Sequence, residues 1–268
     1  MFNFYEKKMK KVSLFGAFIL MAVVMFTSCL GEGSNTSSGT LIGVVRFDSE
    51  KLFKNVLDVS EYEHLYSVAF GGMVEGDCYF VSYELDMDDP ENQSESLQNN
   101  GCYTIKVLDK QQITKFNLQS LLTDTTKLLT NEIPVKNPVY GNSSLYIKGK
   151  FFLSHQIDEP SDQKTTWNLS YDPANMVVEE NDNRIYDLFI RATNSGTQTK
   201  AEKYNTYAYD MGYYLKQVAN TEKNLKNEKF YLRFNYVSEI KGDTAIVWKA
   251  SEKLETSVEM IIPSESSN

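Results

Sequence analysis

The side chains best suited to acid–base and nucleophilic chemistry are sparse in this sequence. His64 and His155 are its two histidines, and they stand more than ninety residues apart. A histidine base works on a nucleophile when a third group orients it, and all three must converge in space. The sequence has no Gly-x-Ser-x-Gly elbow, no histidine pair at helical spacing and no phosphate-binding glycine loop. We therefore expect structural or surface histidines and no catalytic site.

Metal-ligating residues are also poorly spaced. Cys78 and Cys102 are twenty-four residues apart without histidines at ligand spacing, which argues against zinc. Two acidic segments offer the oxygen ligands that calcium prefers. Their residues are Asp86, Asp88, Asp89 and Glu91, then Glu179, Glu180, Asp182 and Asn183. Neither segment has the spacing of a known calcium loop, so we expect solvated hairpin tips and no metal or other cofactor.

Cys78 and Cys102 would be disulfide candidates in an oxidising compartment. They lie near the starts of two strand-like runs, 77–85 and 101–108. If these runs form an antiparallel hairpin, the two cysteines lie about 20 Å apart, whereas a disulfide needs Cα atoms within about 7 Å. The pattern favours free thiols, and a bond between them would show that the hairpin is wrong.

The third cysteine, Cys29, ends an N-terminal leader. Lys7, Lys8, Lys10 and Lys11 precede fifteen uncharged, mostly apolar residues, 12–26. At 1.5 Å per residue these span about 22 Å, less than the roughly 30 Å of a bilayer core. The pattern is that of a signal peptide, residues 1–28. Residues 26–29, Phe-Thr-Ser-Cys, resemble the lipobox of bacterial lipoproteins, although Phe26 replaces the usual leucine. The resemblance implies that Cys29 is lipidated and becomes the first residue after cleavage.

The residues after Cys29 favour a lipid-held, acidic protein. Residues 31–40 are rich in Gly, Ser, Thr and Asn, so we expect a flexible tether over 29–40. Removing residues 1–28, which carry four lysines and one glutamate, changes the net charge from −9 to −12. Such a charge disfavours nucleic acid as a partner and leaves membrane attachment to the lipid.

The rest of the chain alternates apolar and polar residues with period two, which is typical of half-buried strands. The expected strands cover 41–47, 55–59, 65–70, 77–85, 101–108, 144–155, 165–171, 185–192, 211–218, 229–237, 244–249 and 256–262. Turn-forming residues separate most of them. Helix is expected for a turn or two in 118–129, and the ambiguous stretch 201–218 is interpreted as a loop followed by a strand from Met211. Short strands without long amphipathic helices predict an all-β chain of antiparallel barrels or sandwiches.

Two domains are expected in the mature chain. Residues 131–141 contain Pro134 and Pro138 and separate two strand-rich halves, so we interpret them as a linker between domains 41–130 and 142–268. Aromatic residues concentrate in 204–214, at Tyr204, Tyr207, Tyr209, Tyr213 and Tyr214. Core packing explains aromatic residues in strands, but this cluster is where an exposed binding patch would be sought first.

Three segments resemble the NigD-like lipoproteins of Bacteroidetes: GDCYFVSYELD at 76–86, SLYIKGKFF at 144–152 and YDMGYYL at 209–215. The resemblance implies an OB-like N-terminal small barrel followed by a C-terminal immunoglobulin-like β-sandwich. It also implies a family without established enzymatic activity and with a link to bacteriocin immunity. Leu30-Gly31-Glu32 follow Cys29 where family members often carry an aspartate run, which leaves periplasmic or surface exposure open.

The functional hypothesis is therefore a non-enzymatic lipoprotein, anchored in the cell envelope at the outer membrane, that binds an envelope protein or a glycan. A bacteriocin-immunity role rests on the family resemblance alone. A hydrolase whose residues converge only in three dimensions is the third alternative.

Overall fold

A computed structural model describes residues 35–60, 62–120, 124–136, 145–158, 165–195, 202–242 and 245–263. The predicted leader, Cys29 and the first residues of the predicted tether lie outside this range. Within it, the chain is mostly strands with a few short helices, which confirms the all-β prediction. No helix in these segments is long and apolar enough to cross a membrane.

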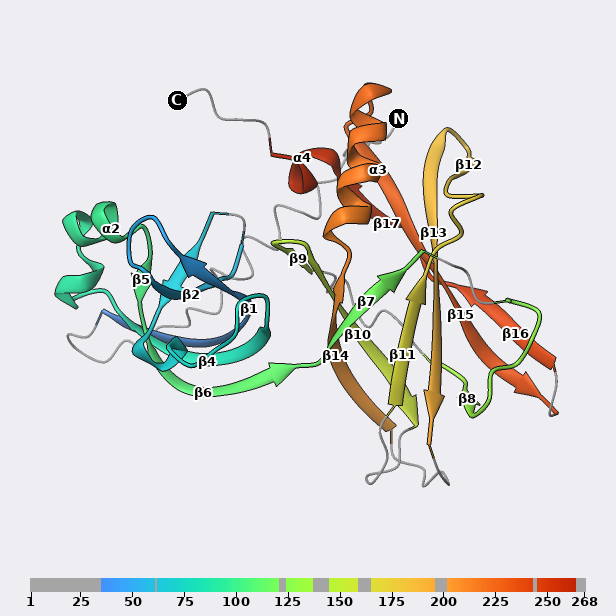
Figure 1. Cartoon of the computed structure of the whole chain (residues 1–268), viewed down its shortest axis with the longest axis horizontal. Helices are drawn as coiled ribbons and strands as arrows, with labels where there is room; N and C mark the ends of the chain where they lie inside the picture. The colour runs from blue at the N-terminus through green and yellow to red at the C-terminus, as the bar shows by residue number, and fades with distance from the viewer. Residues whose placement is uncertain are drawn as a thin grey trace, which may run out of the picture.

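The first domain is a small barrel (Figure 1). Its sheet has the order β5-β3-β2-β1-β4-β6. The strands are β1 (Thr36–Asp48), β2 (Lys54–Asp58), β3 (His64–Tyr66), β4 (Cys78–Asp86), β5 (Tyr103–Thr104) and β6 (Lys106–Ile113). β5 and β6 are separated by Ile105 alone, whose N–H donates to the carbonyl of Tyr66. One continuous segment therefore pairs with β3 at its start and with β4 at its end, and so closes the barrel.

The barrel is shaped by its core and by one glycine. Its inward-facing residues are Val45, Leu57, Leu65, Phe70, Met73, Val81 and Ile105. A β-carbon at Gly43 would lie 2.4 Å from Cγ of Leu57, so only glycine lets β1 pass this close to β2. Three short helical segments lie between the strands: η1 (Val68–Phe70), η2 (Pro90–Asn92) and α2 (Ser94–Asn100).

The second domain consists of two layers that one strand joins. One layer is β9 (Leu145–Ile147), β10 (Lys150–Asp158) and β14 (Glu202–Asp210); the other contains β11 (Thr165–Ser170), β13 (Asn183–Asn194), β15 (Lys229–Lys241) and β16 (Ala245–Ala250). β7 (Lys115–Gln119) pairs with β14 through residues 115–117 and with β11 through Leu118 and Gln119. A strand that changes sheets in this way makes the corner of a sandwich.

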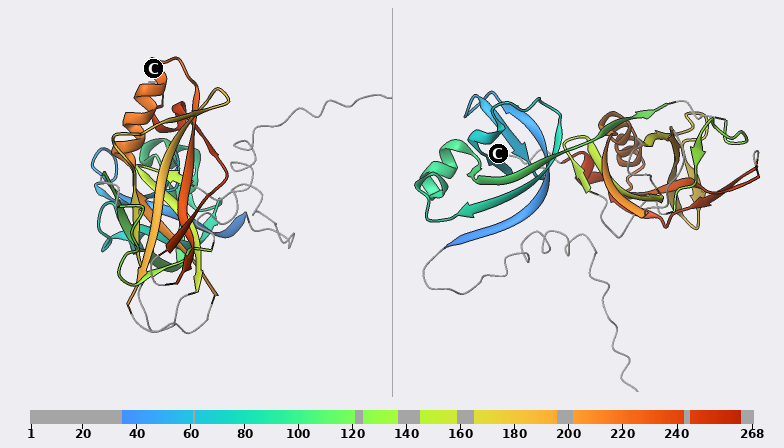
Figure 2. Two further views of the ribbon diagram at one scale, coloured as in Figure 1. Left: turned by 90° about the vertical axis from the view of Figure 1, so that its right-hand side faces the viewer. Right: turned by 90° about the horizontal axis from the view of Figure 1, so that it is seen from below.

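The remaining short strands extend the second layer. β8 (Glu132–Ile133) and β12 (Val178–Glu180) pair with β13, and β17 (Leu254–Ser257) pairs with β15. Seen from below, the second domain curls around its interior (Figure 2). Side chains from both layers fill that interior, and the rings of Phe151 on β10 and Phe234 on β15 lie 6.1 Å apart.

Helices occupy two regions where strands were predicted. The prediction of a strand over 211–218 is wrong, because α3 (Gly212–Asn224) covers it, and α4 (Val258–Ile261) replaces the end of the strand predicted over 256–262. The buried residues of α3 are Tyr214, Leu215, Val218, Ala219 and Glu222, a spacing of three and four. The adjacent aromatic residues Tyr213 and Tyr214 are compatible with both the two-residue period of a strand and the 3.6-residue period of a helix. Packing of the buried residues against the sandwich favours the helix.

Other boundaries also differ from the prediction. β1 begins at Thr36, inside the predicted flexible tether 29–40, because its first residues pair with the end of β4. The run 144–155 is a hairpin of β9 and β10, and its turn places Lys148 and Gly149 at positive φ. The helical turns expected in 118–129 are absent from the described part, where Leu118 and Gln119 belong to β7.

The two domains share a third apolar cluster. It joins Val44, Cys78 and Ile113 of the barrel to Ile147, Phe152 and Ala208 of the sandwich. Thr114 alone separates β6 from β7, and Figure 1 shows β6 leading from the barrel into β7 of the second domain. The crossing therefore lies upstream of the predicted linker 131–141, part of which is β8; the domain limits as such stay a prediction.

Candidate functional site

Exposed apolar side chains concentrate on the barrel. Nine large hydrophobic residues are exposed among the described residues, and seven of them belong to the first domain. These seven are Phe47, Phe53, Tyr62, Val68, Val74, Met87 and Leu108, whereas Tyr213 and Leu225 are on the second domain. Single exposed apolar residues are ordinary, but a group of them marks a contact surface.

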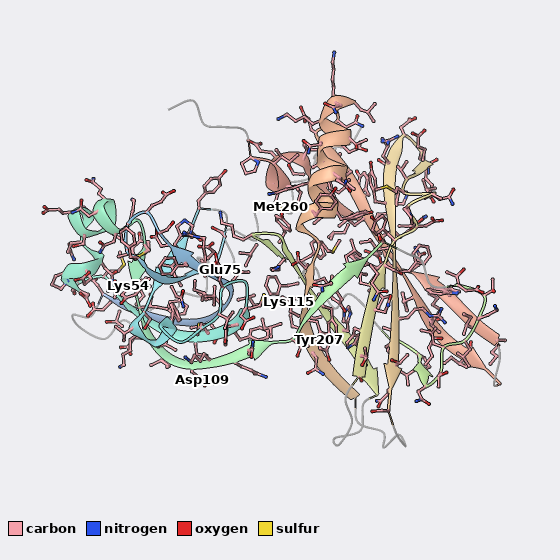
Figure 3. The ribbon with its side chains drawn as sticks, viewed as in Figure 1. Lys54, Glu75, Asp109, Lys115, Tyr207 and Met260 are labelled. Carbon is pink, nitrogen blue, oxygen red and sulfur yellow. The ribbon has the colours of Figure 1, made fainter. Side chains whose placement is uncertain are left out.

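Three of these residues surround one mouth of the barrel, and we call them the apolar rim: Phe47, Phe53 and Val74. Phe47 pairs with Asn55, two residues after Phe53. On its other side, Val45 exchanges backbone hydrogen bonds with Gly76 and Asp77, so Phe47 continues alongside the segment that holds Val74. The neighbours Lys54 and Glu75 mark the two sides of this region on the barrel (Figure 3). The rim residues are 45%, 68% and 66% exposed, respectively.

Phe53 has an unusual backbone conformation. Its φ is +52°, in the left-handed region that bulky residues rarely adopt, and its ring is exposed. The turn before it is fixed by Asp48, whose Oδ1 accepts hydrogen bonds from the N–H groups of Glu50 and Lys51. A strained residue with an exposed ring gains nothing from core packing, which points to a role outside folding.

His64 lies on the same barrel as part of a buried ion-pair network. Its Nδ1 lies 2.7 Å from Oδ1 of Asp58, and Nε of Arg46 donates to Oδ2 of the same carboxylate at 3.0 Å. Asp58 is fully buried, so the guanidinium of Arg46 compensates a charge that would otherwise be costly to bury, and His64 adds a hydrogen-bond contact. These contacts assign His64 to the packing of the barrel wall.

His155 is buried inside the sandwich. Its Nε2 lies 2.7 Å from the hydroxyl of Tyr209, and its ring stacks on Trp167 with centroids 4.3 Å apart. Burial holds the pKa of Tyr209 well above its ordinary value, so the phenol keeps its proton. More than ninety residues separate His155 from His64 in sequence, and the structure places them in different domains. The two histidines do not form one site.

Both described cysteines are free and buried, as the hairpin geometry predicted. β4 and β6 pair antiparallel as expected, but the paired residues of the second strand are 106–113, while Tyr103 and Thr104 of the predicted run 101–108 pair with β3. Burial raises the pKa of Cys78 to about 11 and that of Cys102 to about 11. Thiols with such pKa values remain protonated near neutral pH and are poor nucleophiles and metal ligands.

The acidic segments make contacts within the protein. Asp89 accepts a hydrogen bond from the N–H of Glu91 and so caps η2, while Asp86 accepts one from the N–H of Asp88. In the second segment, Glu180 pairs with Arg233 and Lys253. Within the described segments, no group of three or more histidine, cysteine, aspartate or glutamate residues is arranged to hold a metal ion.

The aromatic cluster expected at 204–214 is mostly core. Tyr207, Tyr209 and Tyr214 are buried, Tyr213 is exposed, and the side chain of Tyr204 lies outside the described residues. The apolar rim was not predicted, because its residues come from two separate segments, the β1–β2 connection and the loop before β4. The signal available was Phe47 and Phe53 on either side of the turn that begins at Asp48.

Comparison with known families identifies the first domain. Residues 33–111 match the family described as "Lipoprotein OB domain". This range covers the closed barrel through most of β6, and the topology of that barrel is the five-stranded one of OB folds. The name of the family implies a membrane-anchored protein of the cell envelope. None of the curated proteins matches the chain in sequence.

Solved structures resemble both domains together. An uncharacterized protein from Parabacteroides merdae matches with a TM-score of 0.68 and 19% identity, covering 82% of this chain and 99% of that one. A candidate lipoprotein from Bacteroides fragilis matches with a TM-score of 0.54 and 12% identity, covering 83% and 98%. At these identities the likeness shows the fold alone.

A NigD-like immunity protein from Bacteroides caccae is also similar, with a TM-score of 0.46, 10% identity and coverage of 82% and 94%. The family match at the barrel, together with the shared two-domain fold, confirms the predicted resemblance to lipoproteins of this architecture. Residues 33–111 of this chain are therefore similar to the lipoprotein OB domain family.

Proposed function

We propose that this chain is a non-enzymatic envelope lipoprotein, held by a lipid on Cys29, that binds a partner protein through the apolar rim of its OB domain. The observation that carries the proposal is the exposure of Phe47, Phe53 and Val74 around one barrel mouth. Aromatic and aliphatic side chains that remain in water in the free protein release that water when a partner covers them.

The surroundings of the rim favour a protein partner over a glycan. Sugar recognition requires polar groups beside the aromatic surface, to pair with hydroxyls. One polar side chain beside the rim is Asn55, and its amide donates to the carbonyls of Phe70 and Met73 at 3.1 and 2.8 Å. Because these bonds occupy the donor within the barrel's own loop, Asn55 has no amide proton left to pair with a sugar hydroxyl. A partner segment with apolar side chains fits this surface best.

The tether keeps the OB domain near the membrane. β1 begins at Thr36, seven residues after Cys29. Seven extended residues reach at most about 25 Å, so the barrel of a lipid-anchored chain lies close to the bilayer surface. This proximity favours a partner that is itself part of the envelope or passes through it.

The test is capture of a partner from solubilised envelopes on the mature protein, followed by reconstitution with the purified partner. Phe47→Ser with Val74→Ser should reduce reconstituted binding by at least about tenfold, because two hydrophobic contacts of 1–2 kcal/mol are lost. Leu108→Ser, at an exposed position on β6, is the matched control and should bind normally.

Three results would contradict the proposal: no captured protein, equal loss in the control, or full binding by the double variant. A glycan array run in parallel covers the alternative ligand class, and binding there without any protein partner would reject the rim as a protein site. If the captured partner is a secreted toxin, the bacteriocin-immunity alternative becomes the specific form of this function.

A further inference from the structure

The negative charge of the chain is concentrated on the barrel. Residues 35–113 contain fourteen aspartates and glutamates but five lysines and arginines, which gives a net charge of −9. Residues 114–268 contain twenty and eighteen, which gives a net charge of −2. The domain that carries the apolar rim is therefore the strongly acidic part of the molecule, although it is the shorter of the two.

Most of this charge is not neutralised within the barrel. Ion pairs with cationic side chains occupy Asp58, Asp77 and Glu84. Two of the remaining acids, Glu75 and Asp109, are labelled on the barrel in Figure 3. A surface with uncompensated carboxylates attracts cations and repels anions. The exposed acids of the barrel that form no ion pair with any described residue are Glu50, Glu63, Glu75, Asp86, Asp88, Glu91, Glu95 and Asp109.

Two of these acids adjoin the apolar rim directly. Glu75 follows Val74 in the loop before β4, and Glu50 belongs to the same β1–β2 connection as Phe53. Both glutamate side chains are exposed, and neither makes a hydrogen bond with the described residues. The rim thus presents apolar side chains beside carboxylates that have no partner in the barrel.

The β1–β2 connection also lies against an acidic helix. Nζ of Lys51 donates to the carbonyl of Gln98 on α2 at 3.3 Å, and Glu95 lies about one helical turn before Gln98. The ammonium group of Lys54, the first residue of β2, lies over the ring of Tyr66, 4.9 Å from its centroid. Because both lysines contact groups of the barrel itself, they leave the neighbouring carboxylates available to a partner.

The charge around the rim determines which class of partner fits. Salt screens charges beyond about 8 Å at physiological ionic strength, so the acids nearest the rim matter most. An acidic protein or an anionic bilayer would be repelled by them. A polypeptide segment with apolar side chains between lysines or arginines matches both the apolar and the acidic parts of this surface.

We propose that the apolar rim receives a cationic, amphipathic segment of its partner protein. The apolar side chains of that segment cover the rim, while its lysines or arginines lie beside Glu50, Glu75 and Glu95. This inference rests on the proposed function, because it specifies the partner of the same rim. Opposite charges across an interface speed association, whereas like charges exclude the wrong partner, so these acids select the partner by the sign of its charge.

Three synthetic peptides of equal length serve as probes, each with a fluorescent label for anisotropy titration of the full mature chain. The first contains leucine and lysine in a helical pattern, the second has glutamate in place of lysine, and the third has serine in place of leucine. We expect the leucine–lysine peptide to bind and the leucine–glutamate peptide not to bind. The serine–lysine peptide should bind at least about tenfold more weakly than the first, because it cannot cover the rim.

Two triple variants of equal net charge test where the acids act. Removing Glu50, Glu75 and Glu95 as Glu50→Gln, Glu75→Gln and Glu95→Gln should weaken binding of the leucine–lysine peptide at least about threefold at about 20 mM salt. The same variant should show a smaller loss of binding when salt is raised. The matched control changes three exposed acids of the second domain and should bind like the unchanged protein: Asp182→Asn, Glu228→Gln and Glu252→Gln.

The proposal is overturned if none of the peptides binds, or if the leucine–lysine and leucine–glutamate peptides bind equally well. Equal losses in the two triple variants would also overturn it, because net charge alone would then explain the binding. The captured envelope protein separates this inference from the proposed function. If Phe47→Ser with Val74→Ser abolishes its binding while the acidic triple variant retains it at every salt concentration, the rim binds a partner that is not cationic. If that double variant still binds it fully, the rim itself is not the binding surface.

Discussion

Arg191 on β13 and Glu132 on β8 form a buried ion pair, in which Nε of the arginine donates to Oε1 of the glutamate at 2.6 Å. Arg191 also donates to the backbone carbonyls of Asp124 and Lys127, at 3.0 and 2.6 Å. One fully buried guanidinium therefore holds residues 124–132 against β13, where β8 pairs with that strand.

Removing one partner of this pair should be strongly destabilising. Glu132→Ala leaves the charge of Arg191 buried and unpaired, so we expect the free energy of unfolding to fall by about 3–5 kcal/mol. Chemical denaturation measures it. The double variant Glu132→Leu with Arg191→Met removes both charges, so its free energy of unfolding should fall much less. Equal losses in the single and double variants would contradict a compensated ion pair.

Gly212 marks the contact between α3 and the β9–β10 turn. A β-carbon at Gly212 would lie 2.9 Å from Cα of Gly149, and backbone on both sides leaves no flexible atom to move. Gly212→Ala should therefore destabilise the protein by about 1–3 kcal/mol. Gly72→Ala is the matched control, since nothing lies within 4 Å of its added methyl group. Thermal unfolding compares the two, and an equal melting temperature would show that the turn can move away.

Because of Glu222, the free energy of unfolding should decrease at acid pH. Burial alone would raise its pKa, but hydrogen bonds from Tyr186, Arg184 and Asn227 outweigh burial and lower the pKa below 4.5. Because the folded pKa is the lower one, the stabilisation is complete above pH 4.5 and is lost as the pH falls through the folded value. Glu222→Gln should cost about 1–3 kcal/mol at neutral pH, through weakened hydrogen bonds.

The deciding measurement is the gap in unfolding free energy between this variant and the unchanged protein, followed from pH 7 downward. The gap should narrow below pH 4.5, because protonation makes the native carboxyl neutral as well. Glu75→Gln, on the surface of the barrel, controls for the loss of one negative charge (Figure 3). A gap that stays constant with pH would mean that Glu222 contributes packing alone.

We expect Phe53 to lower the stability of the barrel and to contribute to partner binding. Its left-handed backbone costs about 1–2 kcal/mol for a residue with a β-carbon, and glycine adopts the same φ freely. After the greater chain entropy of glycine is included, Phe53→Gly should stabilise the barrel by up to about 1 kcal/mol and weaken partner capture. Phe53→Val should destabilise it. A loss of stability in the glycine variant would show that the ring packs in the free protein.

Cys29 should be the attachment point to the membrane. Cys29→Ser has no thiol to receive a lipid, so we expect the protein in the soluble fraction of fractionated cells. Ser28→Ala retains the thiol and should remain with the membranes. Mass spectrometry of the purified native protein provides the direct readout, as an acylated N-terminal cysteine. A retained Met1, or an unmodified Cys29, would remove the basis for the envelope role.

Period-two patterning located most of the strands because burial of one face imposes it directly on the sequence. It also located the β4–β6 hairpin and with it the free state of Cys78 and Cys102. The pattern failed at α3, because Tyr213 and Tyr214 suit both a strand and a helix. There, the packing of Leu215 and Val218 against the sandwich favours the helix. It also missed β14 as a strand separate from the helix, because aromatic residues run through both.

The sequence by itself determined the acidic charge, the lipoprotein-like leader and the all-β composition, since each depends on residue types and on spacing within short segments. Only the tertiary structure decided which residues meet. Phe47 and Val74 lie near each other because Val45 bonds to Gly76 and Asp77, and Trp167 and Asn194 share an inner face because β11 pairs with β13. Contacts between distant segments follow from strand register and closure, which no local pattern encodes.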